Sequence, residues 1–374
     1  MTLLLLVLSG WIQGPAEAPR PEPALVPSAP PAEKGKDFRA ATILLEDRLA
    51  VAHRGREEAQ KRYSQGLCST AELLRWDRRL VAAYLDTCQR NEDRGKGWEY
   101  LMERATAVRD FEKRRKEAKP ELGGSELFEA DYCIALAKLQ LFELQKADPS
   151  RVGEARKTLI AVCRDGYTDR LTAFRKGECL ISEPLLWSKR WFHAEWDPSA
   201  SVVSHRRAAK SHLDRINEVE TAWKRLPAPD KKPAIDPADE LACRRAEIAA
   251  YLANDPQQIP GLFADYAERM RRMRDVVLTA SREDRLAIEP ALDWLDRWFD
   301  AEMLTLKPDA EPDRLFTHAV LVHRELELDA RRRLDEGSRF VGEADLLAVA
   351  YARLGVEIRL SQLRARQTAD RGKK

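Results

Sequence analysis

The chain has 374 residues, of which 44% are hydrophobic and 34% are charged. This length allows two or three domains, and the high charged share is typical of long, exposed helices. The 64 basic and 62 acidic residues leave a net charge of +2, without the basic excess on one face that a nucleic-acid-binding surface requires. We therefore expect no nucleic-acid partner.

An apolar run over residues 2–8 is followed by small residues in an A-x-A arrangement that ends at Ala18. The run is far shorter than the roughly 20 residues that span a bilayer, so we expect no transmembrane span. We interpret residues 1–18 as a signal peptide, although no Lys or Arg precedes the run. Residues 19–36 contain six prolines and are predicted to be a disordered tether. The protein is thus expected in the periplasm or cell envelope.

A tryptophan-containing stretch occurs three times at nearly equal intervals along the chain. The copies are Trp76–Val81, Trp187–Phe192 and Trp294–Phe299. A second marker, an Ala-Asp pair, occurs at Ala130, Ala238 and Ala344 with nearly the same step. Two markers with one period predict three tandem units of about 107 residues.

The predicted units cover residues 38–147, 151–254 and 260–365, and each contains two antiparallel helical hairpins. In the first unit, the helices are expected over residues 38–64, from Thr70, over 98–118 and over 126–146, with a break at residues 91–97. No window alternates between apolar and polar residues, so no strands are predicted. The expected fold is all-α, an array or bundle resembling a coiled coil, followed by a disordered tail at residues 366–374.

The recurring tryptophans are expected to be core anchors, because such large rings dominate packing when they are buried. The anchors are Trp76, Trp187, Trp191, Trp294 and Trp298. A sugar-binding platform is the alternative for these rings. Trp196 and Trp223 do not recur and are better candidates for exposed contacts. Cys68 and Cys179 occupy the position of Leu286 in the third unit, which indicates a small buried hydrophobic side chain.

The first predicted turn reads Arg62-Tyr63-Ser-Gln-Gly66-Leu-Cys-Ser-Thr-Ala-Glu-Leu-Leu74. It resembles the helix-turn-helix signature of TolC-type outer-membrane efflux proteins. The resemblance implies a coiled-coil hairpin in an exported envelope protein, with Arg62, Tyr63, Gly66 and Leu74 at a tip that contacts a periplasmic adaptor. Only the hairpin portion is similar, since the chain lacks predicted strands for the β-barrel of that family.

The six histidines raise the question of a metal site. His205 and His212 are seven residues apart, and His318 and His323 are five apart, whereas chelating helical pairs lie at i and i+4. No nucleophile elbow or phosphate-binding glycine loop is present. We therefore expect neither catalytic residues nor a metal or cofactor.

Three functions are consistent with the sequence. The first is an exported, non-enzymatic scaffold or interaction protein of the cell envelope with protein partners. The second is a component of an efflux or transport assembly that docks through its hairpin tips. The third, of another class, is a metal-dependent enzyme built on His193, His205 and His212. The sequence leaves the oligomeric state and the choice between a rod and a folded-back bundle open.

Overall fold

The computed structural model describes residues 36–118, 125–197, 200–227, 233–306, 312–338 and 341–371. The described residues form α-helices and one short 3-10 helix, with no strand among them, so this part of the chain is all-α as predicted. The helices are α1 (Lys36–Ser64), α2 (Thr70–Thr87), α3 (Asn91–Ala118), α4 (Ser125–Leu144), α5 (Pro149–Arg175), α6 (Ser182–Glu195), α7 (Val202–Trp223), α8 (Pro237–Leu252), α9 (Ile259–Arg282), α10 (Ile288–Thr305), α11 (Pro312–Asp335) and α12 (Glu343–Arg371). The predicted signal peptide and the tether up to residue 35 lie outside the described residues.

Two predicted boundaries differ from the structure. Residues 91–97 are helical, because α3 begins at Asn91 with acidic Glu92 and Asp93 in its first turn, where they complement the helix dipole. A glycine fits at position 97 because the Tyr84 ring packs closely there. A Cβ atom at this position would lie only 3.1 Å from that ring. At the other end, α12 continues to Arg371, so most of the predicted tail from residue 366 is helix.

The turns between paired helices share one backbone feature. Gly66, Gly177 and Asp284 adopt positive φ angles of 70°, 76° and 55° just after α1, α5 and α9. Glycine adopts this left-handed conformation at little cost, and Asp is among the few other residues that tolerate it. The steps between the three residues in the sequence equal those between the recurring tryptophans.

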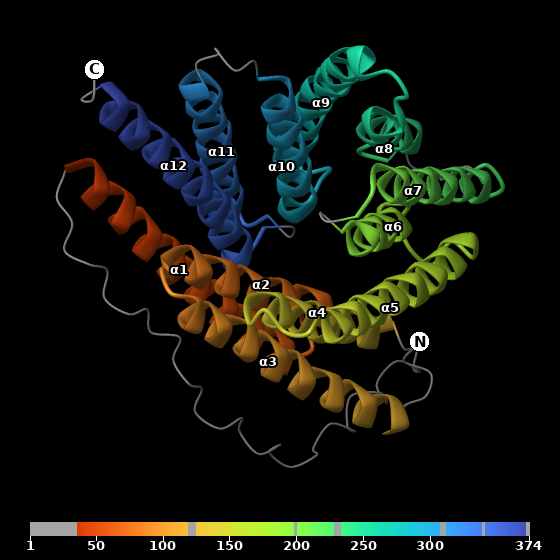
Figure 1. The fold of residues 1–374 in the computed structure, drawn as a ribbon. Coiled ribbons are helices and arrows are strands. Elements are labelled where there is room, and N and C mark those ends of the chain that lie inside the picture. Colours follow the sequence, from red (N-terminus) through yellow and green to blue (C-terminus); the bar gives the residue numbers. More distant parts are fainter. Residues whose placement is uncertain are drawn as a thin grey trace, which may run out of the picture.

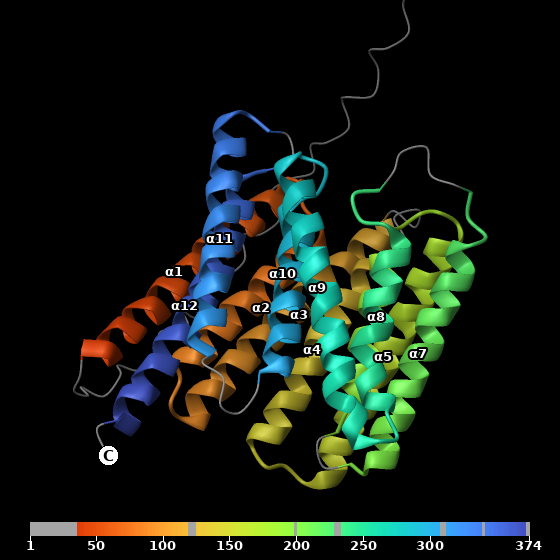
Figure 2. The same ribbon diagram turned by 90° about the horizontal axis from the view of Figure 1, so that it is seen from above.

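Most consecutive helices lie side by side, α10 and α11 being in the least contact, and the chain closes on itself (Figures 1 and 2). The last helix, α12, packs against α1 as extensively as α3 packs against α4. The contacts α4–α5, α8–α9 and α12–α1 are those that three cyclically arranged units would make with one another. The chain is therefore folded back rather than extended as a rod, while its origin by threefold duplication stays a prediction.

The closure joins the two ends of the chain in one core. The largest apolar cluster contains Leu49 of α1, Trp76 of α2, Trp298 of α10 and Tyr351 of α12. Three smaller apolar clusters are formed by residues of helices α4, α5, α6, α7 and α8. In α12, the side chains of Leu347, Tyr351, Leu354 and Ile358 recur at 4, 3, 4 spacing, which is typical of a helix-pairing seam, and all four are buried.

Candidate functional site

The helices that carry the recurring tryptophans, α2, α6 and α10, each have an arginine one turn after the first of these tryptophans. The guanidinium carbon of Arg79 lies 4.8 Å from the Trp76 ring centre, and the distances are 4.6 Å for Arg190 and Trp187 and 4.0 Å for Arg297 and Trp294. Trp76, Trp187, Trp294 and Trp298 are buried, whereas Trp191 is only partly buried. The indoles thus face the core, and each first indole supports a guanidinium by a cation–π contact.

Two glycines that the sequence analysis did not single out make room for these rings. A Cβ atom at Gly55 would lie 2.1 Å from the Trp76 ring, and one at Gly166 would lie 2.5 Å from the Trp187 ring. The two glycines are as far apart in the sequence as the two tryptophans are. Buried Met273 occupies the corresponding position of α9. The equal spacing of the two glycines and the two tryptophans in the sequence is the signal that could have identified these glycines.

The four residues assigned to the hairpin tip have different environments. Leu74 is fully buried, so its assignment to an exposed tip contact is wrong. Tyr63 donates a hydrogen bond of 2.5 Å to Glu112 of α3, and Arg62 pairs with Glu72 at 2.7 Å. Gly66 is exposed in the turn. Leu74 lies within α2 and belongs to the buried face of that helix, together with Leu73, rather than to the exposed turn.

Ion pairs connect the tryptophan-bearing helices with one another and with α4. Glu129 of α4 accepts a hydrogen bond of 2.7 Å from Arg190 of α6 and lies 3.6 Å from Arg78 of α2. Glu289 of α10 pairs with Arg79 at 2.6 Å and with Arg75 at 3.2 Å. Burial acts to raise the pKa of Glu129, but Arg190 and Arg78 outweigh it and lower that pKa.

A cavity of about 440 Å³ opens between the first turns of α2, α4 and α6 and the last turns of α5. Its wall combines arginines, glutamates and an apolar side. The charged and large apolar residues of the lining are Arg75, Arg78, Arg170, Arg190, Glu126, Glu129, Glu183, Leu186 and Trp187. The sequence alone does not reveal this site, because its lining comes from four helices and only Trp187 among these residues was predicted to be a core anchor.

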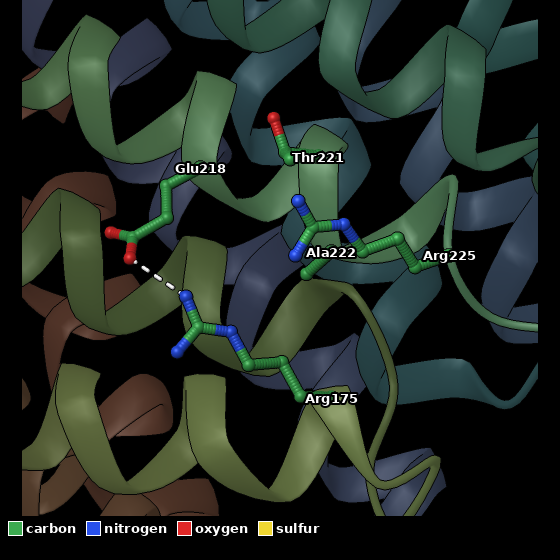
Figure 3. A pocket seen from close by; sticks show the side chains of 5 residues that line it. All are labelled: Arg175, Glu218, Thr221, Ala222 and Arg225. Atoms are coloured by element: carbon green, nitrogen blue, oxygen red, sulfur yellow. Dashed lines mark hydrogen bonds and ion pairs between the residues drawn. The ribbon is translucent and has the colours of Figure 1, made fainter.

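A shallower pocket of about 300 Å³ lies between the ends of α5 and α7 (Figure 3). Arg175 and Glu218 form an ion pair of 2.9 Å across it, and the second oxygen of Glu218 accepts a hydrogen bond from Tyr167. Thr221, Ala222 and Arg225 complete the lining. Both oxygens of the Glu218 carboxylate are already engaged, so the exposed Arg225 is the group of this pocket that remains for a ligand.

The histidines are engaged in other contacts. His212 is buried and hydrogen-bonded to Ser188 at 2.7 Å, and His205 stacks on Trp196 with ring centres 4.1 Å apart. His193 is exposed on α6. In the described part of the chain, no group of His, Cys, Asp or Glu side chains could hold a metal ion. Trp196 and Trp223, the two candidates for exposed contacts, are both partly buried.

Cys68 and Cys179 make the same contact in two hairpins. Each thiol donates to a main-chain carbonyl nine residues earlier, Ala59 at 3.3 Å and Arg170 at 3.4 Å. Burial raises the pKa of both thiols to about 11, so they stay protonated and are poor nucleophiles. All six cysteines of the chain lie in the described residues, and none is in a disulfide.

Among the described helices, none combines the length and apolar character needed to cross a bilayer. No protein-family model matches the chain, and no curated protein matches its sequence significantly. The similarity to TolC-type proteins therefore rests on the residues of one turn and stays a prediction.

Proposed function

We propose that the protein is a non-enzymatic helical scaffold that binds other proteins through the end carrying the α1–α2 and α5–α6 turns. The observation that carries this proposal is the exposure of large apolar side chains at these turns. Leu67 is 64% exposed and Leu180 is 72% exposed. Exposed apolar groups that cluster at one end of a molecule are typical of protein-binding surfaces.

The two turns are spatial neighbours. Ser69, which follows the α1–α2 turn, and Leu186, in the first turns of α6, line the same cavity. Leu186 is itself 39% exposed and is a third accessible apolar side chain at this end. This end therefore supports the first function inferred from the sequence.

Docking to an efflux assembly is the narrower version of the proposal. With Leu74 buried, a partner could reach the exposed residues of this turn, which include Gly66 and the apolar Leu67. The longest helices have 29 residues, about 44 Å at 1.5 Å per residue. Such helices are too short for a tunnel across the periplasm, so the role proposed within this version is that of an accessory component.

The test is chemical crosslinking in cells, followed by identification of the crosslinked proteins. Leu67→Ser combined with Leu180→Ser should abolish the main crosslink, because both substitutions remove apolar contact surface at one end. Leu321→Ser combined with Leu328→Ser is the matched control, since these leucines are exposed on α11. A partner that binds both double variants equally contradicts the proposal.

Cell fractionation addresses the proposed export. The protein should be found with envelope proteins and should begin after residue 18. If the crosslinked partner is a periplasmic adaptor, the efflux version is favoured, whereas another envelope protein favours the general scaffold. An intact N-terminus together with a cytoplasmic location would exclude both envelope roles.

A further inference from the structure

The cavity between α2, α4, α5 and α6 contains carboxylate oxygens that lack hydrogen-bond donors. Oε2 of Glu126 and Oε2 of Glu129 are buried and accept no hydrogen bond from the described residues, although the Glu129 atom lies 3.6 Å from Nη1 of Arg78 as a long ion pair. Glu129 is only 8% exposed. A buried acceptor without a donor is energetically unfavourable, so both atoms favour a bound group that donates hydrogen bonds.

The same cavity also has spare donors. The nearest partners of Arg78 are the Cys133 sulfur at 3.7 Å and Glu129 at 3.6 Å, which are long contacts for a guanidinium with five N–H donors. Arg75 is one-third exposed and uses one terminal nitrogen for Glu289. Both side chains line the cavity and can bind an anionic group.

The rest of the wall is mixed, because Arg170, Glu183 and Arg190 line the cavity as well. In the sequence of α6, Leu186 and Trp187 lie between Glu183 and Arg190 and give the cavity an apolar side. At about 440 Å³, the cavity falls in the usual range for small-molecule sites, roughly 300–1,000 Å³. It can therefore hold a short methylene chain with a charged group at each end.

From this arrangement we infer that the cavity binds a small zwitterion. The ammonium group donates to Glu126 and Glu129, the carboxylate accepts from Arg75 and Arg78, and the connecting carbon chain contacts Leu186 and Trp187. A simple anion would leave the two glutamate oxygens without donors, and a simple cation would meet the arginines. The inference does not rest on the scaffold role, although the cavity lies at the same end of the molecule and Leu186 contributes to both surfaces.

Isothermal titration calorimetry with a matched series of small molecules tests the inference. The zwitterions are 4-aminobutanoate, 5-aminopentanoate and 6-aminohexanoate, and the singly charged controls are hexanoate and hexylamine. At least one zwitterion should bind saturably with a Kd below about 1 mM, and both controls should bind at least about tenfold more weakly. Absence of saturable binding by all three zwitterions, or equal binding of a singly charged control, overturns the inference.

Two substitutions locate the binding in the cavity. Glu126→Gln should weaken zwitterion binding at least about tenfold, which corresponds to the loss of one charge-assisted hydrogen bond. Glu178→Gln, at an exposed position in the α5–α6 turn, should leave it unchanged. Leu186→Trp keeps every charged group and fills the space, so it should abolish binding. Circular dichroism checks the fold of each variant, and if Glu126→Gln does not fold, Leu186→Trp decides. Wild-type affinity in a folded Glu126→Gln or Leu186→Trp variant contradicts the assignment.

Discussion

At the scale of single residues, glycine determines how closely α1 and α2, and likewise α5 and α6, approach each other. Gly166 lies directly against the buried Trp187 ring, whereas a Cβ atom at Gly153 of the same helix would meet nothing within 4 Å. The two positions therefore separate the effect of packing from that of helix propensity. Glycine costs helix stability at both, but only at Gly166 does the packing require it.

Gly166→Ala should destabilise the protein by about 1–3 kcal/mol, because the added methyl group overlaps a rigid indole. Gly153→Ala should be neutral or stabilising by up to about 1 kcal/mol, since alanine is the better helix former. Urea denaturation monitored by circular dichroism measures both free energies of unfolding. Equal effects of the two substitutions would show that the Trp187 contact does not restrict this position.

His212 contributes to the loss of folding stability at acid pH. Burial, followed by the nearby Arg215, lowers its pKa to about 3. An unfolded histidine has a pKa near 6.5, so the unfolded chain binds the proton first as the pH falls. Above about pH 6.5 the group is neutral in both states. As the pH falls from 6.5 to 3, the free energy of unfolding should decrease by at most about 1.4 kcal/mol per pH unit.

His212→Gln should therefore flatten the dependence of the unfolding free energy on pH between 6.5 and 3. The matched control is His205→Gln on the same helix, at a partly buried position stacked against Trp196. Denaturant titrations at several pH values provide the measurement. An unchanged pH profile in the His212 variant would mean that this imidazole is not kept neutral by the fold.

At the scale of the element, α10 carries a face of three carboxylates. Asp293, Asp296 and Asp300 lie at i, i+3 and i+7 and are accessible to solvent, although protein surrounds the Asp296 carboxyl on most sides. This environment raises the pKa of Asp296 to about 7, and repulsion by Asp293 and Asp300 adds to the effect of burial. Nearby Arg79 and Arg359 oppose the shift without cancelling it.

Because the folded protein binds the Asp296 proton more tightly than the unfolded chain does, stability is lost as the pH rises from about 4 to 7. Asp296→Asn should therefore raise the melting temperature at pH 8 relative to the wild type, and the difference should vanish near pH 4. Asp265→Asn, on the exposed side of α9, is the control. Thermal melts across this range would contradict the prediction if Asp296→Asn had no effect at pH 8.

At the scale of the whole molecule, the contact between α12 and α1 makes the core continuous. Tyr351 of α12 donates a hydrogen bond of 2.9 Å to the main-chain carbonyl of Arg79 in α2, and its ring lies 6.4 Å from that of Trp76. Arg48 of α1 lies over the same tyrosine ring at 4.2 Å. One side chain of the last helix thus contacts both helices of the first hairpin.

Removal of residues 343–374 should abolish cooperative unfolding, because it exposes the apolar faces of α1 and α11 that α12 covers. Binding of an apolar fluorescent dye and denaturant titration are the measurements. A chain that ends at Arg371 is the control and should unfold as the full chain does. If the chain without α12 unfolds cooperatively at the original midpoint, the closure does not contribute to stability.

The sequence alone was sufficient for the all-α class and, in the first predicted unit, for most helix boundaries, because apolar spacing and residues such as Ser69 and Gly66 act locally. It did not predict the start of α3 at Asn91, because Gly97 taken alone favours a break. The close packing of Tyr84 against Gly97, which favours glycine in this helix, is visible only in the folded structure. The repeated tryptophans were recognisable as a pattern. Their glycine partners, Gly55 and Gly166, became evident only when the helices were seen packed.

The binding site and the closure were decided by tertiary structure. Glu126 and Arg78 are distant in the sequence, and their common cavity exists only because α2, α4, α5 and α6 pack together. Likewise, whether the helices form a rod or close into a ring depends on α12 reaching α1. Local spacing determines which face of a helix is apolar, but the distant surface that covers this face is selected by shape and charge across the whole chain.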